Sequence, residues 1–261
     1  MSESNHLVAI EGGVARVTLN RPAVHNALDD KLIADLRATL EGLAADAAVR
    51  LVMLTGQGAS FCAGGDLAWM RRTADYTFEQ NLADAMMLAR LLHTLNVMPQ
   101  PTVALVNGPA YGGGVGLVAC CDIAVAADTA KFSLSEVRLG LIPATISPYV
   151  VRKIGESSAR RYFLTAEVFE AADAERMGLV HEVVAAAGMD EAAAWFAKRL
   201  REGGPRSQAA AKQLIARVAG APIDEGLMAD TAERIASQRA SAEGMEGTEA
   251  FLAKRPPAWR S

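Results

Sequence analysis

The stretch P-T-V-A-L-V-N-G-P-A-Y-G-G-G-V-G-L-V-A-C-C-D, residues 101–122, decides how this chain folds. It begins with Thr102–Val106, an apolar, β-branched run enclosed by a proline and an Asn-Gly pair, which is typical of a buried strand. Three glycines follow at 112–114, and the residues beyond them are apolar as far as Cys121. A long apolar run after a strand and a glycine turn predicts a buried helix.

Consecutive glycines at the start of a helix leave the backbone N–H groups unshielded by side chains. Because the positive end of the helix dipole lies behind them, these groups suit an anion or a developing oxyanion. The spacing is neither the G-x-G-x-x-G of a dinucleotide site nor the G-x-x-x-x-G-K-[ST] of a P-loop. The alternative is a flexible turn that lets the helix pack closely on a sheet, because glycine clusters are common in turns.

A second strand with a glycine turn lies earlier in the chain. Residues 51–54 are apolar and end at Thr55 and Gly56, and the loop beyond them carries F-C-A-G-G-D-L at 61–67. Asp66 begins a helix-like segment, so a strand again runs through small residues into a helix. One such turn offers one backbone donor, and two turns offer a pair of the kind that stabilises an enolate.

Six stretches, in order along the chain, resemble the enoyl-CoA hydratase/isomerase family, also called the crotonase superfamily. They are L-N-R-P-A-V-H-N-A-L (19–28), F-C-A-G-G-D-L (61–67), N-G-P-A-Y-G-G-G-V-G-L (107–117), C-D-I-A-V-A (121–126), F-S-L-S-E-V-R-L-G-L-I-P (132–143) and E-G-T-E-A-F-L-A-K-R-P-P-A-W (246–259). The resemblance implies an α/β fold, with a crotonase-like spiral of ββα units over residues 1–200. It further implies a C-terminal helical region, residues 201–261, that trimerises the protein and closes the active site of a neighbour.

The resemblance also implies which residues form the site. Gly65 and Gly113 supply the two backbone N–H groups of an oxyanion hole, and Glu136 is the catalytic acid and base. The residues that it places against coenzyme A are Asn26, Ala27, Leu28, Ala63, Gly64, Asp66, Leu67, Phe251 and Lys254. Coenzyme A is part of the thioester substrate, and the resemblance implies no metal, nicotinamide or flavin.

Glu136 stands alone where many hydratases of the family use two glutamates, because the first of these positions is Gly116 in this chain. Three interpretations stay open. Glu136 hydrates by itself, or the protein is an isomerase that shuttles a proton with one base, or it binds thioesters without turning them over efficiently. From the residues alone, S-L-S-E at 133–136 also matches a capping box, in which the glutamate only satisfies helix N–H groups.

The residues after Pro143 predict the kind of acyl group. A-T-I-S-P-Y-V at 144–150 replaces the glycine run and Thr-Gln of many relatives. Together with G-V-G-L at 114–117, it resembles the bacterial branch associated with methylglutaconyl-CoA hydration in leucine breakdown, or with isohexenylglutaconyl-CoA in terpenoid breakdown. The prediction is a hydro-lyase for a branched 2-enoyl-CoA. Such substrates carry an extra carboxylate, for which Arg138 is a candidate cation.

Composition and charge argue against several other classes of function. The chain has 261 residues, 51% of them hydrophobic and 21% charged, as in soluble globular proteins. A net charge of −4 argues against nucleic-acid binding, although RNA binding has been ascribed to one relative and is kept as a rival. The three cysteines form no metal-binding pattern and fit a reducing compartment. With neither a secretory signal at its start nor a membrane span, the chain is expected to be cytoplasmic. The family resemblance implies a homotrimer or a dimer of trimers.

Periodicity and turn residues predict the remaining elements. Strands are expected at 7–10, 14–19, 51–54, 102–106, 122–127 and 179–184. Helices are expected at 29–45, within 67–97, after 112, and at 152–166, 171–178, 189–201, 205–218, 224–241 and 245–254. Successive strand–helix–strand passages predict a parallel sheet with right-handed crossovers.

Overall fold

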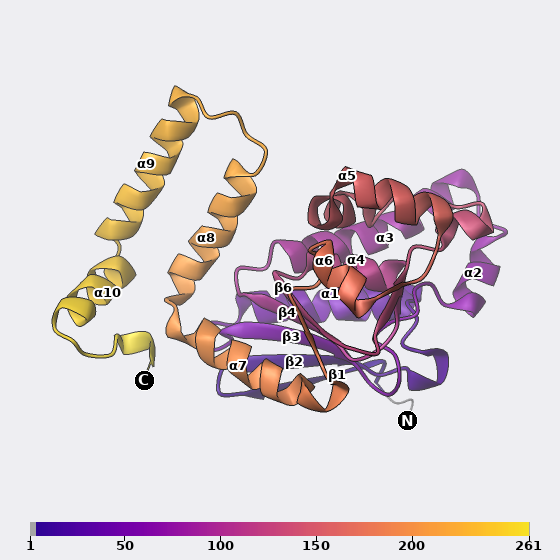
Figure 1. Cartoon of the computed structure of the whole chain (residues 1–261), viewed down its shortest axis with the longest axis horizontal. Coiled ribbons are helices and arrows are strands. Elements are labelled where there is room, and N and C mark those ends of the chain that lie inside the picture. Colours follow the sequence, from indigo (N-terminus) through magenta and orange to yellow (C-terminus); the bar gives the residue numbers. More distant parts are fainter. Residues whose placement is uncertain (1–3, 261) are drawn as a thin grey trace.

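The computed structural model describes residues 4–260, and Figure 1 shows sheets covered by helices, with a helical arm on one side. Residues 1–3, where the segment assessed for a secretory signal begins, lie outside the described part. The larger sheet contains β1 (His6–Glu11), β2 (Val14–Leu19), β3 (Leu51–Gly56), β4 (Thr102–Val106), β6 (Ile123–Ala127) and β9 (Glu182–Val184). Its spatial order is β1-β2-β3-β4-β6-β9. β1 and β2 form an antiparallel hairpin, and all the other neighbours are parallel.

A smaller sheet contains the three short strands β5 (Ala110–Tyr111), β7 (Lys131–Ser133) and β8 (Phe169–Glu170). The chain runs from β4 through β5 into α4 (Gly113–Cys120), and then from β6 through β7 into η2 (Glu136–Leu139) and α5 (Ser147–Thr165). A one-residue parallel bridge joins Cys62, in the loop after β3, to Ala110 of β5 in the smaller sheet. The chain therefore repeats ββα units in a spiral, and this confirms the expected fold.

The central strands of the larger sheet, β3, β4 and β6, are buried on both faces, which explains why they are continuously apolar, whereas the edge strand β1 is largely exposed. Val52 and Leu54 belong to the main core under the helices. Leu51 and Met53 point to the opposite face and pack with α7 (Met189–Glu202). Side chains in a strand alternate between faces, so one apolar run supplies both cores.

The helices begin where polar caps or small residues allow. The elements not yet named in the first 202 residues are η1 (Pro22–Val24), α1 (Asp30–Ala45), α2 (Leu67–Thr73), α3 (Phe78–Asn96), α6 (Ala171–Arg176) and η3 (Ala186–Gly188). The Asp29 carboxylate caps α1 by accepting from the N–H of Leu32 at 2.7 Å. α5 begins five residues earlier than predicted, because Pro148 fits within its first turn.

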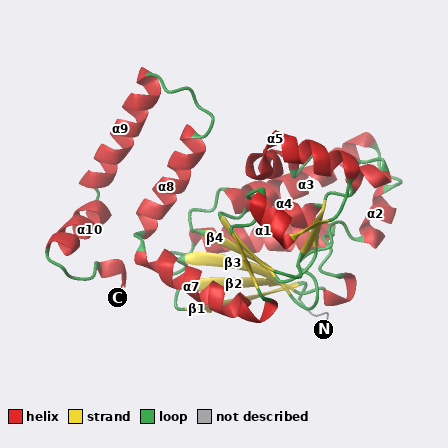
Figure 2. Cartoon of the chain, in the orientation of Figure 1, coloured by secondary structure: helices red, strands yellow, loops and turns green. Residues whose placement is uncertain are grey.

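Three helices form an arm beyond Gly203 and Gly204, and Figure 2 shows no strand in it. They are α8 (Pro205–Val218), α9 (Glu225–Ala240) and α10 (Ala242–Leu252), and η4 (Ala258–Arg260) follows. Lys212 joins α8 to the core through an ion pair with Asp122 at 2.7 Å. Whether the residues after 200 act as a separate functional region stays a prediction.

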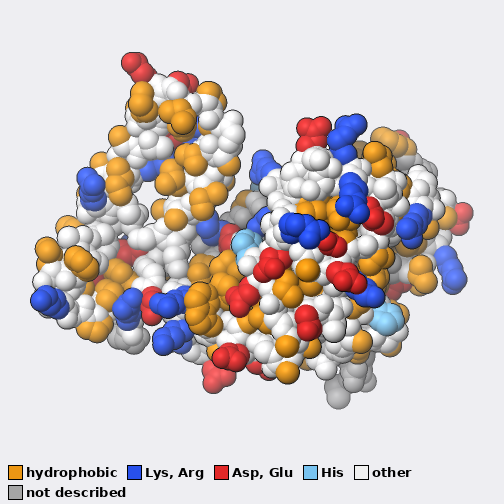
Figure 3. Space-filling view, viewed as in Figure 1, with side chains coloured by type: hydrophobic (Ala, Val, Ile, Leu, Met, Phe, Trp, Pro, Cys, Tyr) orange, Lys and Arg blue, Asp and Glu red, His pale blue; other side chains and the backbone are white. Residues whose placement is uncertain are grey.

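The arm leaves many apolar side chains uncovered, and Figure 3 shows hydrophobic surface along it. The exposed large residues on it are Ile215, Ile223, Met228, Ile235, Met245, Phe251 and Leu252. None of the helices over residues 4–260 is both long and apolar enough to cross a membrane.

Candidate active site

The two glycine turns meet at one residue, Leu28. The N–H of Leu28 donates to the carbonyl of Gly64 at 2.7 Å, and its own carbonyl accepts from the N–H of Asp66 at 2.8 Å. Gly65 therefore faces Leu28 in a one-residue parallel bridge. On the other side, a Cβ atom placed on Gly113 would lie 2.8 Å from Cδ1 of Leu28. The structure thus brings Gly65 and Gly113 to the same leucine.

Both glycines have a backbone N–H that is not used within the protein. Gly112 donates to Ser133 at 2.9 Å and Gly116 donates to Gly112 at 3.2 Å, but within residues 4–260 neither Gly65 nor Gly113 donates a hydrogen bond. Gly65 is exposed, and Gly113 lies in the first turn of α4, where an N–H has no helical acceptor. Their assignment to an oxyanion hole agrees with this geometry and stays a prediction.

Glu136 lies against the same turn. A Cβ atom on Gly112 would lie only 3.1 Å from Oε1 of Glu136, while Oε2 is buried without a hydrogen-bond partner. Burial raises the pKa of the Glu136 carboxyl, and a hydrogen bond from its own backbone N–H opposes this only in part. A carboxylate with a raised pKa and one oxygen free of hydrogen bonds is suited to proton transfer.

The capping-box interpretation of residues 133–136 is wrong. No side-chain cap is formed at the start of η2, and the hydroxyl of Ser133 donates instead to the carbonyl of Ala166 at 3.3 Å. The sequence pattern was misleading because the segment folds as a short 3-10 turn after a strand, and not as the start of a long α-helix.

The space beside Gly116 is filled by Ile146, at the start of α5. A Cβ atom on Gly116 would lie 2.3 Å from Cγ2 of Ile146 and 3.4 Å from Cδ2 of Leu92. Ile146 is almost completely buried. The two departures noted in the sequence, Gly116 and the segment 144–150, are therefore one packing arrangement, and it leaves no room for a glutamate at position 116.

The predicted coenzyme A residues of the two loops lie together, although several are already used internally. The buried amide of Asn26 donates to the carbonyls of Gln57 and Ser60 and accepts from the N–H of Arg21. Ala27 and Leu28 are also buried, whereas Leu67 is 71% exposed. Nothing in these contacts tests the binding roles of Asn26, Ala27, Leu28, Ala63, Gly64 or Leu67, which stay predictions.

Asp66 is used as a helix cap. Its carboxylate accepts from the N–H groups of Ala68 and Trp69 and from the guanidinium of Arg21. Burial raises the pKa of Asp66, but the hydrogen bonds from Trp69, Ala68 and Arg21 together bring it below its ordinary value. Arg21 has three partners in this site and was not singled out from the sequence, where an arginine before a proline looks like any surface arginine.

Phe251 and Lys254 do not join the other predicted site residues. α10 and α2 lie on opposite sides of the molecule in Figure 1, and Phe251 is 82% exposed. Their assignment to a neighbour's site is not tested by one chain. Arg138 is exposed on η2, two residues after Glu136, and forms no ion pair with any residue in 4–260.

The thiols near this site are buried. Burial raises the pKa of Cys62 and of Cys121 to about 12, which keeps both as neutral thiols. They pack as small apolar residues in the main core. Across residues 4–260, no cluster of three or more His, Cys, Asp or Glu side chains is arranged to hold a metal ion.

Stacked ββα turns, with glycine loops that meet beside a buried carboxylate, define a crotonase-type α/β protein. A family model described as enoyl-CoA hydratase/isomerase matches residues 9–261. The chain therefore belongs to the enoyl-CoA hydratase/isomerase family, and it is an enzyme of that family.

Individual relatives match over nearly their whole length. The crystal structure of an enoyl-CoA hydratase from Shewanella pealeana ATCC 700345 is 44% identical with a TM-score of 0.96, and the match covers 98% of this chain and 96% of that chain. Pseudomonas aeruginosa AtuE is 38% identical with a TM-score of 0.95, over 99% of this chain and 100% of that chain. The 2,3-dehydroadipyl-CoA hydratase of Escherichia coli K12 is 33% identical, over 97% of this chain and 98% of the relative.

The packing of Ile146 on Gly116 predicts strong coupling between these positions. Gly116→Glu alone should destabilise the protein by about 3 kcal/mol through overpacking, and Ile146→Ala alone by about 2–5 kcal/mol through a cavity. The double variant should lose at least about 1 kcal/mol less than the sum, because the smaller residue makes room for the larger. Urea unfolding of the four proteins measures this coupling. The control is Gly116→Glu combined with Ile10→Ala on exposed β1, for which the two losses of stability should add. If the losses at 116 and 146 also add, the contact is contradicted.

The raised pKa of Glu136 predicts how stability changes with pH. The folded protein holds this proton at a pH where the unfolded chain has lost it, so the contribution of Glu136 to wild-type stability falls as pH rises from about 4.3, an ordinary glutamate pKa, through the raised value. Glu136→Gln should remove this loss and melt at a higher temperature than wild type at pH 8, with little difference at pH 4. Thermal melts at both pH values measure it. Glu41→Gln, in an exposed ion pair, should show no such gain, and a Glu136→Gln protein less stable than wild type at pH 8 would refute the interpretation.

Proposed function

We propose that this enzyme is a hydro-lyase that adds water across the 2,3 double bond of an enoyl-CoA thioester. The observation that carries the proposal is the buried Glu136 carboxylate, whose Oε2 has no hydrogen-bond partner and which lies beside the glycine turn where the N–H of Gly113 is unused. Gly65 and Gly113 are the proposed oxyanion donors, and Glu136 is the proposed acid and base. This chemistry needs neither a metal nor a redox cofactor.

In the proposed reaction, Glu136 takes a proton from water while the water oxygen forms a bond to Cβ of the thioester. The π electrons of the double bond move to the carbonyl oxygen and form an enolate, which the two backbone N–H groups stabilise. The enolate then collapses, and Cα takes the proton from the protonated Glu136. The product is a 3-hydroxyacyl thioester, and the carboxylate is regenerated. One carboxylate performs both transfers because it is protonated in the first step and deprotonated in the second.

The proposed acyl group is branched and of the methylglutaconyl type, which would place the enzyme in leucine breakdown. The side chains beside Gly116 are those of Ile146 and Leu92, and these apolar surroundings support an apolar acyl group. A second carboxylate on the substrate is supported by Arg138, an exposed cation close to Glu136 in the chain, and by the name of the relative that hydrates 2,3-dehydroadipyl-CoA, the thioester of a dicarboxylic acid. A cytoplasmic location is part of the same proposal.

An enoyl-CoA isomerase is the second candidate, and the absence of a glutamate at position 116 is the observation that favours it. An isomerase needs only one base to carry a proton along the acyl chain. The products separate the two functions, because a hydratase adds the mass of water and an isomerase leaves the mass unchanged.

Hydration of 3-methylglutaconyl-CoA and crotonyl-CoA by wild type and by Glu136→Gln tests the proposal. Wild type should hydrate the branched substrate faster, and Glu136→Gln should lose a factor of about a hundred or more, because the amide keeps the shape but cannot accept the proton. Mass spectrometry of the products and the rate of loss of the enoyl chromophore measure both. Glu41→Gln should retain full activity. A wild type that hydrates neither thioester would refute the hydratase proposal, and a product of unchanged mass would establish the isomerase.

We propose further that the enzyme is a homotrimer or a dimer of trimers, in which Phe251 and Lys254 close the site of a neighbouring subunit. The support is the uncovered apolar surface of the arm, since α8 contains no fully buried residue and α9 contains only Leu227. An apolar face of this kind is normally covered by another subunit.

Mixed oligomers test the shared site. Co-expression of Glu136→Gln with Phe251→Ala/Lys254→Ala should give more activity than the two separate variants together, because some sites in the mixture carry neither change. Activity of the doubly tagged, co-purified oligomer measures this. A mixture of Glu136→Gln and Glu136→Ala should show no gain. If the first mixture co-purifies and also gains nothing, the neighbour does not complete the site.

A further inference from the structure

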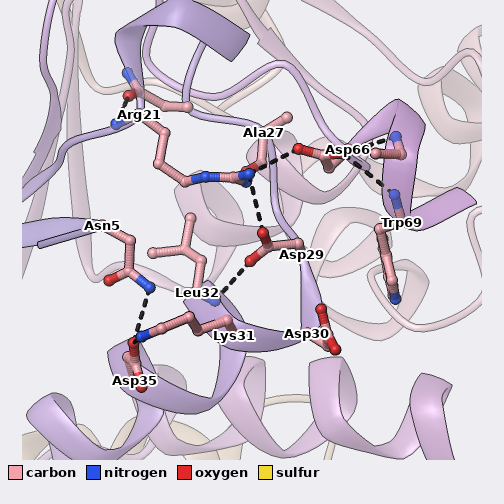
Figure 4. Close-up of polar contacts among 12 residues, drawn as sticks. Asn5, Arg21, Ala27, Asp29, Asp30, Lys31, Leu32, Asp35, Asp66 and Trp69 are labelled. Carbon is pink, nitrogen blue, oxygen red and sulfur yellow. Dashed lines mark hydrogen bonds and ion pairs between the residues drawn. The ribbon is translucent and has the colours of Figure 1, made fainter. Parts of the chain in front are cut away.

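One guanidinium connects the two loops that meet at the proposed oxyanion hole. Arg21 lies in the loop after β2, and its side chain is only 20% exposed. Its Nη2 lies 2.9 Å from Oδ2 of Asp29 and 2.8 Å from Oδ2 of Asp66, and its Nη1 donates to the carbonyl of Ala27. Figure 4 shows the guanidinium between these three groups.

These contacts hold both sides of the bridge between Leu28 and Gly65. Ala27 and Asp29 are the residues before and after Leu28, and Asp66 is the residue after Gly65. The guanidinium therefore holds segment 27–29 at the residues on each side of Leu28. It also joins this segment to Asp66 in the other loop. Arginine is suited to this because its planar fork donates to several acceptors in a fixed geometry.

The arginine is itself held in place. Its backbone N–H donates to Oδ1 of Asn26 at 2.9 Å, and its carbonyl accepts from the N–H of Asn26 at 2.9 Å. His25 and Asn26 have φ values of 54° and 56°, in the left-handed region that side chains other than glycine rarely adopt. The loop keeps this conformation because the buried Asn26 amide is hydrogen-bonded on all sides, so the guanidinium starts from a fixed position.

The direction of the Gly65 N–H depends on this arrangement. The carbonyl of Gly64 and the N–H of Gly65 belong to one planar trans peptide, so they point in opposite directions. The Leu28 N–H holds that carbonyl at 2.7 Å. Fixing the position of Leu28 therefore fixes the direction of the Gly65 N–H, which has no partner of its own in the protein.

We propose that Arg21 is a positioning residue for catalysis, which sets the direction of the Gly65 N–H through Leu28 and Asp66. The proposal rests on the proposed role of Gly65 as an oxyanion donor. Arg21 touches neither the thioester nor the reacting atoms in this assignment. It fixes the donor that stabilises the enolate, and its loss should affect the transition state more than the binding of coenzyme A.

Three variants test this role. Arg21→Lys keeps the charge without the fork, Arg21→Gln removes the charge, and Asp29→Asn weakens one of the three contacts while leaving the arginine. In each, kcat for enoyl-CoA hydration should fall, by about ten- to a hundredfold for the Arg21 variants, somewhat less than for outright loss of an oxyanion donor. The KM and the inhibition constant of free coenzyme A should stay within about threefold. Arg37→Gln, which breaks an exposed ion pair on α1, is the matched control and should match wild type.

A spectroscopic measurement follows the donor directly. Cinnamoyl-CoA absorbs at longer wavelength when its carbonyl is polarised, so the bound thioester reports hydrogen bonding to that oxygen. Measured in a Glu136→Gln background, which prevents turnover, the shift should be large with Arg21 present and clearly smaller with Arg21→Lys. The band shift requires no hydration. A wild-type protein that shifts the band but hydrates nothing would therefore refute the hydratase proposal, while the band shifts of the Arg21 variants would still test the positioning role.

Two outcomes would overturn the inference. In the first, Arg21→Gln keeps kcat within twofold of wild type and gives the full band shift. In the second, Arg21→Lys and Asp29→Asn lose coenzyme A affinity and thermal stability in proportion to kcat, which would make Arg21 a residue of the fold alone.

Discussion

Two backbone hydrogen bonds, from Leu28 to Gly64 and from Asp66 to Leu28, fix the glycine on which the proposed chemistry depends. They form an isolated one-residue parallel bridge between the loop after β2 and the loop after β3. This bridge leaves the Gly65 N–H without a protein acceptor. The direction of the N–H is therefore determined by the two loops, and a backbone donor of this kind needs no reorganisation during a reaction.

The carboxylates around this point differ in whether their negative charge is compensated. Asp29 and Asp66 each accept from a helix N-terminus and from Arg21, so their charges are compensated. Glu136 is also largely enclosed, but its Oε2 receives no such contact. Uncompensated burial is unfavourable for folding and favourable for proton transfer, which is the usual conflict between stability and activity at an active site.

Long apolar elements could be predicted from the sequence, and short or non-local features could not. β4 and α8 have the predicted bounds, because a β-branched run between turn residues and a proline after two glycines are strong local signals. β5 and β8 have two residues each, too few for any periodicity, so the ββα repeat was reached through the resemblance alone. The contact of Ile146 with Gly116 joins positions thirty residues apart, and no local sequence pattern predicts it.

That contact also restricts how such sequences change over generations. A side chain at position 116 needs space that Ile146 occupies, so a lineage of this kind acquires a second glutamate only through a destabilised intermediate. If the glutamate arises first the core is overpacked, and if residue 146 becomes smaller first the core carries a cavity. Ancestors and descendants on either side of this barrier are separated by an unstable step, and this favours the persistence of each form once it has arisen.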